Sequence, residues 1–281
     1  MSTTTSSILK RYSDYLADET FCIFLFHGVI PQHRHRIRNY TRKHIDVARF
    51  TEVLDDLQSG HCISLDEARS GSVPARSYVM TFDDGFENNY SIVYPILCDR
   101  GLAATFYITT GFVHYRTRSW TDIIEAAVEV MPGEDTGKIK LLEKIRKEVK
   151  NDPGIDPYWY AEDFQSRHGI GSSDHWLDSK LSFSQISEMA AHPLMTIGGH
   201  GHTHRVLSYL SQPDLEQEIR TSLELLGYPR HYSYPEGLAE HYNQNVIDVL
   251  KAEGIVCCPT AIAGVNKPVD DPFHYRRIMV V

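Results

Sequence analysis

The sequence predicts an α/β fold built around a parallel β-sheet. Short, continuous apolar runs alternate along the chain with longer segments in which apolar residues recur every three or four positions. Strands that alternate with helices in this way form βα units, and their strands pair in parallel. Several apolar runs are followed directly by polar residues, and the carboxyl ends of parallel strands are where such folds place their functional sites.

The N-terminal part of the chain, up to residue 113, alternates regularly. Residues 21–26 (FCIFLF) form an apolar run typical of a strand buried on both faces. The spacing of apolar side chains predicts a helix over 47–57 that ends near Gly60. The next predicted elements are a strand over 78–82, a helix over 89–100 with Gly101 just past its end, and a strand over 103–108.

Residues 114–180 interrupt the alternation. Helices are predicted over 121–130, 138–150 and 157–168, and their charges are densest in the run LLEKIRKEVKND. A run of this kind is typical of a solvated helix face. We interpret the segment as a helical insertion within a single domain that spans residues 1–281.

The alternation resumes after the insertion. The predicted elements are a helix over 184–191, a strand over 194–197, a helix over 214–226 that ends at Gly227, a short strand over 232–234, a helix over 245–253, a strand over 255–258 and a last strand over 275–281.

Composition limits the classes of partner. The 281 residues include 28 Lys and Arg against 37 Asp and Glu, which gives a formal charge of −9. This charge argues against nucleic acid, because phosphate binding requires clustered Lys and Arg. It also argues against strongly anionic substrates, unless the chain folds a local basic cleft. The five cysteines are odd in number and lack C-x-x-C spacing, so we expect reduced, mostly buried thiols.

The start of the chain lacks the features of a membrane or export segment. Its longest apolar stretch, over 21–26, is far shorter than the about 20 residues that span a bilayer. The preceding residues contain no apolar core of signal-peptide length and include Asp14, Asp18 and Glu19. We expect no transmembrane segment and a cytoplasmic protein.

Three histidines follow the predicted strand over 194–197. His200 and His204 are four residues apart, a spacing that places two imidazoles on one side of a single turn. Together with one carboxylate they would form a hydrolytic zinc centre with a position left for water. His202 would then point elsewhere and is the least expected ligand of the three. The alternative is a polar loop without a metal.

Two adjacent carboxylates, Asp83 and Asp84, end the predicted strand over 78–82. Neighbouring residues at a strand end point in different directions. One carboxylate can therefore bind a metal while the other stays within reach of the attacking water. The alternative is an Asp-Asp-Gly turn selected only for its backbone preferences.

Together these segments resemble the polysaccharide deacetylases of carbohydrate esterase family 4. Residues 81–85 (TFDDG) match the first motif of that family, and 200–204 (HGHTH) match its H-[ST]-x-x-H motif except at Gly201. Residues 234–237 (YPEG) resemble the third motif. The resemblance covers residues 20–113 and 181–281. It implies a distorted, incomplete (β/α) barrel that hydrolyses an N-acetyl group on a sugar with the help of a divalent metal.

The resemblance also implies roles for individual residues. Asp83 would be the general base, and Asp84, His200 and His204 would hold one divalent ion, usually Zn²⁺. Such a ligand set also accepts Co²⁺, Ni²⁺ or Fe²⁺. The family offers a backbone N–H at the position of Tyr234.

The backbone N–H of Tyr234, the residue before Pro235, would stabilise the oxyanion together with the metal.

The sequence departs from the family at its last motif, since no Leu-x-His occurs near the C-terminus. In a branch with rearranged motif order, the general acid follows an N-terminal strand, and His27 matches that position. Histidine titrates near neutrality and suits this role. A His that only caps the strand is the alternative, and His274 is the next choice of acid.

The Arg that often opens the third motif is also absent, because Tyr232 stands there. Arg277, followed by Ile278, resembles the Arg-Ile ending of the rearranged branch and could orient Asp83. A solvated strand-end Arg is the alternative.

The expected substrate is an N-acetylated sugar that is nucleotide-linked, lipid-linked or part of a small glycoside, because a cytoplasmic enzyme cannot reach extracellular polymer. A related amide hydrolase, either a deformylase or an allantoinase-like enzyme, and a catalytically inactive carbohydrate-binding relative are the alternatives. The sequence does not indicate the oligomeric state. We expect the insertion to flank the cleft, with aromatic residues that stack on sugar or pack the insertion core: Trp120, Tyr158, Trp159, Tyr160 and Trp176.

Overall fold

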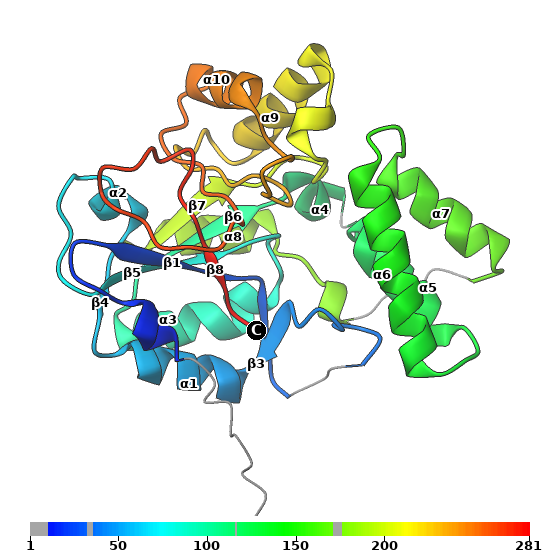
Figure 1. Ribbon diagram of the computed structural model, residues 1–281, viewed down its shortest axis with the longest axis horizontal. Coiled ribbons are helices and arrows are strands. Elements are labelled where there is room, and N and C mark those ends of the chain that lie inside the picture. The colour runs from blue at the N-terminus through cyan, green and yellow to red at the C-terminus, as the bar shows by residue number, and fades with distance from the viewer. Residues whose placement is uncertain (1–10, 33–35, 116, 171–175) are drawn as a thin grey trace, which may run out of the picture.

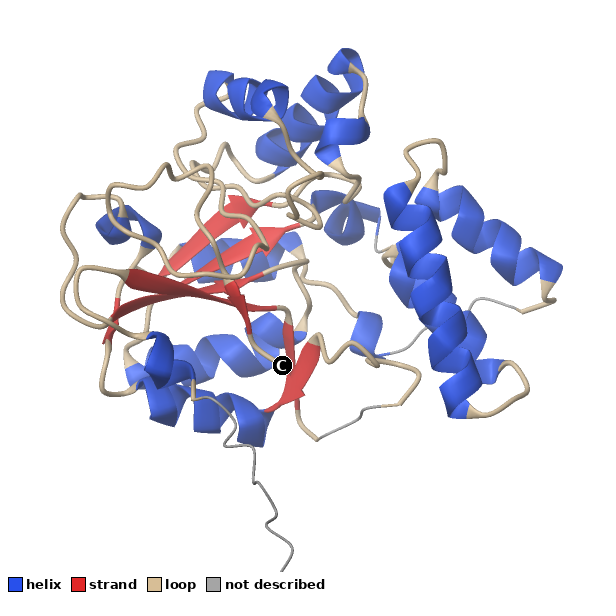
Figure 2. Ribbon diagram, viewed as in Figure 1, coloured by secondary structure: helices blue, strands red, loops and turns tan. Residues whose placement is uncertain are grey.

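A six-stranded parallel sheet forms the centre of the computed structural model, which describes residues 11–32, 36–115, 117–170 and 176–281 (Figure 2). Its strands are β1 (Phe21–Phe26), β4 (His61–Cys62), β5 (Ser77–Phe82), β6 (Ala104–Ile108), β7 (Met195–Gly199) and β8 (Ile278–Met279). They follow the order β7-β6-β5-β1-β8, and β4 pairs with the first residues of β5. All these pairs are parallel, which confirms the predicted α/β class.

Between β7 and β8 the sheet continues through single contacts instead of strands. Gly199 at the end of β7 pairs with Tyr232, and the neighbouring segment is joined through a bridge to Cys257. The N–H of Thr260 then donates to the carbonyl oxygen of Tyr275 at 2.8 Å, just before β8. These contacts lead from β7 back to β8 and β1. The fold is therefore a distorted, incomplete (β/α) barrel, as expected.

The predicted strands over 232–234 and 255–258 are wrong as continuous strands, and the one predicted over 275–281 is shortened to β8. Pro235 and Pro259 directly follow the first two segments. Proline has no backbone N–H to donate to a neighbouring strand, so the ladder cannot extend beyond isolated bridges.

Helices surround the barrel on both sides of the sheet (Figure 1). α1 illustrates why they form, because Asp46 caps its first turn and one face buries Phe50, Val53 and Leu57. A π-helical turn at Asn89–Val93 precedes α3, where a single helix over 89–100 was predicted. The barrel helices are α1 (Val47–Leu57), α2 (Leu65–Ala68), α3 (Tyr94–Arg100), α4 (Thr110–Tyr115), α8 (Phe183–Ala190), α9 (Gln212–Leu225) and α10 (Gln244–Ala252).

Three further helices form a lobe beside the barrel, drawn in green at the right of Figure 1. They are α5 (Trp120–Val130), α6 (Asp135–Asn151) and α7 (Pro157–Arg167), which confirms the three helices predicted within 114–180. The lobe has its own apolar core, which includes Ile124, Leu142, Ile145 and Phe164. Residues 116 and 171–175 of the predicted insertion lie outside the described residues.

The remaining elements are short. β2 (Gly28–Ile30) and β3 (His44–Asp46) form a separate two-stranded parallel sheet directly after β1. Turns of 3₁₀ helix occur at Tyr12–Tyr15, Trp176–Asp178 and Leu207–Tyr209.

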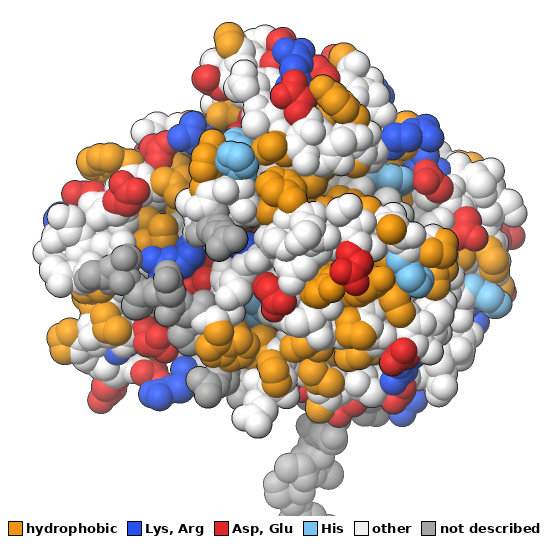
Figure 3. Space-filling view, turned by 180° about the vertical axis from the view of Figure 1, so that it is seen from behind, with side chains coloured by type: hydrophobic (Ala, Val, Ile, Leu, Met, Phe, Trp, Pro, Cys, Tyr) orange, Lys and Arg blue, Asp and Glu red, His pale blue; other side chains and the backbone are white. Residues whose placement is uncertain are grey.

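Acidic and basic side chains are interspersed on the face shown in Figure 3. Among the helices of the described residues, none has the length and apolar character needed to cross a membrane. The first ten residues, on which part of the expectation about export rests, lie outside the described ranges. The five cysteines are free thiols, and three of them are buried.

Candidate active site

The predicted site residues converge at the carboxyl ends of three strands of the sheet, the neighbours β1 and β5 and, beyond β6, β7. His27 follows β1, Asp83 and Asp84 follow β5, and His200 follows β7. β1 and β5 pair in register up to Phe26 and Phe82, so His27 and Asp83 lie level with each other. One pocket is lined by every predicted site residue except Pro235.

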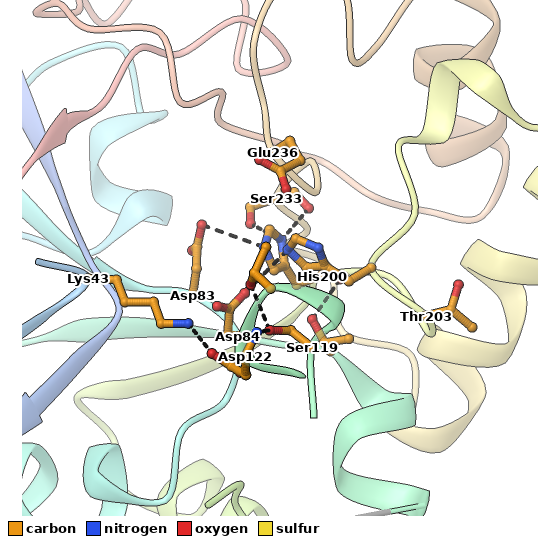
Figure 4. Close-up of polar contacts among 12 residues, drawn as sticks. Lys43, Asp83, Asp84, Ser119, Asp122, His200, Thr203, Ser233 and Glu236 are labelled. Carbon is orange, nitrogen blue, oxygen red and sulfur yellow. Dashed lines mark hydrogen bonds and ion pairs between the residues drawn. The ribbon is translucent and has the colours of Figure 1, made fainter. Parts of the chain in front are cut away.

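Asp84, His200 and His204 form a group with the dimensions of a metal site. One potential ligand atom from each lies within 4.8 Å of the others. Asp84 Oδ1 is 3.6 Å from His200 Nε2 (Figure 4). The same oxygen is 3.3 Å from His204 Nε2. Although this oxygen is buried, none of the described residues forms a well-aligned hydrogen bond with it. A cation between the three side chains would satisfy it, so the residues fit a divalent ion.

The surroundings of His200 direct one ring nitrogen towards this site. Its Nδ1 lies 2.9 Å from the backbone oxygen of Ser233 and 2.7 Å from Ser233 Oγ. Because a carbonyl oxygen only accepts, Nδ1 carries the proton and Nε2 keeps its lone pair. This tautomer suits a metal ligand.

Electrostatics keep two of these side chains in the form that binds metal. Burial alone would raise the pKa of Asp84, but the close contact with His204 and the charge of its ring hold it well below its usual value. Burial lowers the pKa of His200 to about 4, against the attraction of Asp83. The pKa of His204 is raised instead, because its contact with Asp84 outweighs burial. A ligand histidine binds metal in its neutral form, so a protonated His204 would have to release its proton to an incoming ion.

The turn that carries the histidines explains the departure from the family motif at Gly201. Its φ of +77° is unfavourable for a side chain, and a Cβ would lie 2.9 Å from a carboxylate oxygen of Glu218. That carboxylate accepts the N–H groups of His202 and Thr203 and so holds the turn in place. The His202 ring contacts Thr110 at 3.0 Å and is not part of the metal group.

Asp83 is held by Arg277, from the far end of the chain. The two guanidinium nitrogens donate to its two oxygens at 2.8 and 2.9 Å, and Arg277 is only 1% exposed. Arg277 Nε also donates to the backbone oxygen of Thr260. The alternative of a solvated arginine is therefore wrong. Burial would raise the pKa of Asp83, but the charge of Arg277 outweighs it and keeps the carboxylate ionised.

His27 lies in the same pocket, close to both carboxylates. Burial lowers its pKa below the usual histidine value, while the charges of Asp84 and Asp83 oppose this shift. His274, the second choice for the acid, instead contacts the hydroxyl of Tyr242 at 3.0 Å and does not line the pocket.

Tyr234 lines the pocket as well. Its hydroxyl donates to the backbone oxygen of Phe273, and its ring stacks on Tyr242 at 4.3 Å. Within the described ranges no acceptor takes the Tyr234 N–H, which leaves it available to a ligand. Pro235 packs next to Gly201.

Several pocket residues were not predicted. Glu236, inside the YPEG motif, forms a largely buried ion pair with Lys150 of α6. Arg146, one turn earlier on α6, lines the pocket as well, and so does Lys43. The interpretation of 141–152 as a solvated face is therefore wrong for Arg146 and Lys150. The sequence signal that could have indicated this is the spacing of four residues between Arg146 and Lys150, which places both on one side of the helix beside the buried Val149.

The insertion is docked onto the turn that carries the three histidines. Tyr158 donates its hydroxyl to the backbone oxygen of Thr203 at 3.0 Å, and Arg205 pairs with Asp156 at the start of α7.

The predicted sugar-stacking aromatics behave differently from one another. Trp120 belongs to the lobe core and also lines the pocket. Trp159 and Trp176 are 64% and 46% exposed, and neither lines it. Tyr158 and Tyr160 pack against the lobe core.

The family model named "Polysaccharide deacetylase" matches residues 70–151, which include the TFDDG motif. Over this segment the chain is similar to the polysaccharide deacetylases. The match continues into α5 and α6, so the insertion carries part of a resemblance that was expected only outside it. No curated protein sequence matches the chain.

Solved structures share the fold over nearly the whole chain. IcaB from Ammonifex degensii has a TM-score of 0.61 at 20% identity, and the match covers 95% of this chain and 93% of that one. The BpsB deacetylase domain from Bordetella bronchiseptica has a TM-score of 0.58 at 18% identity, with 94% and 97% covered. The deacetylase PplD from Streptococcus pyogenes, solved in complex with acetate, has a TM-score of 0.59 at 15% identity, with 93% and 92% covered.

Proposed function

We propose that this protein is a metal-dependent hydrolase that removes the N-acetyl group from an N-acetylated sugar. The observation that carries the proposal is the arrangement of Asp84, His200 and His204 beside Asp83, which Arg277 keeps ionised and oriented. The match of residues 70–151 to the polysaccharide deacetylase model supports the reaction type, and two of the similar structures are named as deacetylases.

Asp84, His200 and His204 would hold the ion, with Zn²⁺ as the proposed metal. A divalent ion bound there polarises the amide carbonyl and lowers the pKa of a nearby water. Asp83 accepts the proton of the attacking water. Its carboxylate suits this role because it stays ionised while buried.

The remaining steps use groups on the wall of the pocket. The free N–H of Tyr234 donates to the oxygen that becomes negatively charged when water adds to the carbonyl carbon. The amine nitrogen leaves only after it is protonated, and His27 supplies that proton. His27 follows a different strand from Asp83, so the two groups can serve different sides of the reacting carbon.

Metal content and acetate release together test the proposal. We expect the purified protein to bind one divalent ion and to release acetate from an N-acetylated sugar, and a chelator should abolish the release. Asp83→Asn should keep the metal and lower turnover by about 10²-fold or more. A protein that stays fully active in chelator would overturn the metal role. Loss of metal in Asp83→Asn but not in Asp84→Asn would mean that the two carboxylates exchange roles.

A further inference from the structure

The basic side chains of the pocket are paired with carboxylates, with one exception. Arg277 pairs with Asp83, Lys43 with Asp122 and Lys150 with Glu236. Arg146 also lines the pocket, yet no ion pair is found for it in the described part of the chain.

The guanidinium of Arg146 rests over the ring of Tyr40, with 5.8 Å between its central carbon and the ring centroid. This contact orients the group without neutralising its charge. Arg146 and Lys150 lie one helical turn apart on α6, so they face the pocket together.

Besides Arg146, a divalent ion held by Asp84, His200 and His204 would add positive charge to the pocket. Asp84 is the single carboxylate in that group, and it would neutralise only half of a divalent ion. Arg146 acts on Glu125 and Glu236 through its charge, but among the described residues it forms no close ion pair with either. The occupied pocket would therefore carry positive charge at the ion and at Arg146 that no directly paired carboxylate offsets, in a chain whose net charge is −9. The oxyanion formed during hydrolysis offsets the first charge, but a neutral sugar offers nothing to the second.

We propose that the substrate is an N-acylated sugar that carries a phosphate group, bound by Arg146 with Lys150 beside it. This inference rests on the proposed function, because it names the substrate class of the same site. A guanidinium presents several donors in a planar fork that matches phosphate oxygens. The first turn of α5 adds the hydroxyls of Ser119 and Thr121 to the same wall.

The phosphate could belong to a free sugar phosphate, to a nucleotide-linked sugar or to a lipid-linked sugar, since all three present the same group. If a free sugar phosphate binds as tightly as the nucleotide-linked and lipid-linked sugars, the free sugar phosphate is the source. Additional affinity for a nucleotide-linked or a detergent-solubilised polyprenyl-linked sugar would select one of the others.

The test compares matched neutral and anionic sugars. Binding of N-acetylglucosamine 1-phosphate and of methyl N-acetylglucosaminide is measured by calorimetry, with and without Zn²⁺. We expect the phosphate to bind about 10-fold or more tightly, and Arg146→Gln to reduce that preference by about 10-fold. Lys144→Gln removes the same charge from an exposed position of α6 and should leave the preference unchanged. The preference for the phosphorylated sugar should persist without Zn²⁺, because Arg146 binds the phosphate. A preference caused only by phosphate binding to the ion would disappear when Zn²⁺ is left out.

Several outcomes would overturn the inference: equal binding of the two sugars, an equal loss in Lys144→Gln, or tighter binding of an N-acetylated sugar with a carboxylate in place of the phosphate. Acetate release separates this result from the proposed function. Release from both sugars without an anionic preference defeats only the substrate class. A preference that depends on Arg146, without acetate release from any sugar, supports phosphate binding and defeats the deacetylase proposal.

Discussion

Arg277 donates hydrogen bonds to both carboxylate oxygens of Asp83, at 2.8 and 2.9 Å, although the two residues are 194 positions apart in the sequence. Both side chains are buried. The pair joins the end of β5 to the start of β8. It determines the direction in which Asp83 points and keeps its pKa low, so the site depends on the last residues of the chain.

Replacing Arg277 with Lys should lower kcat by about 10²-fold, because a single ammonium cannot hold both oxygens in one orientation. Metal content should stay full, since Arg277 does not contact the metal group. Steady-state kinetics and metal analysis of the same preparation check this. The matched control is Arg276→Lys, since Arg276 makes no contact with Asp83. Wild-type turnover in Arg277→Lys would show that orientation of Asp83 is unimportant.

His204→Ala should lose the metal, whereas His202→Ala should retain it. Both residues lie on one turn, but only His204 belongs to the group around Asp84. Elemental analysis after dialysis measures the difference directly. Equal metal content in the two variants would contradict the assigned ligand set.

His27→Ala should lower kcat by about 10²–10⁴-fold at full metal content, if His27 supplies the proton to the leaving amine. An acid acts only while protonated, so activity should fall as pH rises through its pKa. Burial lowers that pKa, which places the decline below the usual histidine value of 6.5. The pH profile of kcat/KM should lose this alkaline limb in the variant. A loss of only a few-fold would assign the acid to another residue.

Lys150→Met should destabilise the protein by about 3 kcal/mol, because it leaves Glu236 buried without its partner. The folded-state pKa of Glu236, about 2, lies below its unfolded value, so its contribution to stability is present above about pH 4.5 and is lost as pH falls towards 2. The variant should therefore lose less stability than the wild type between pH 5 and pH 3. Urea denaturation at several pH values measures this, and the exposed Lys147→Met is the control. Parallel pH curves would contradict the role of the pair.

Short-range patterns predicted most of the fold. The apolar runs at β1, β5 and β6 and the helical periodicity of α1 and α5–α7 agree with the structure to within a few residues at each end. The segments at 232–234 and 255–258 differ because backbone pairing decides whether an apolar run becomes a strand. Proline ends each of them, so neither is long enough to form a ladder.

The sequence by itself determined the residues at the strand ends, because Asp83, Asp84, His200 and His204 lie in two short motifs whose geometry is local. The resemblance also pointed to Arg277, but only the tertiary structure decided that this arginine is buried against Asp83 and which other residues surround the motifs. Arg277 reaches Asp83 through the pairing of β8 with β1, while Arg146 and Lys150 reach the pocket through the docking of α6. A charged side chain on a helix looks the same in sequence whether water or a carboxylate faces it. The difference arises when distant segments pack and exclude the solvent.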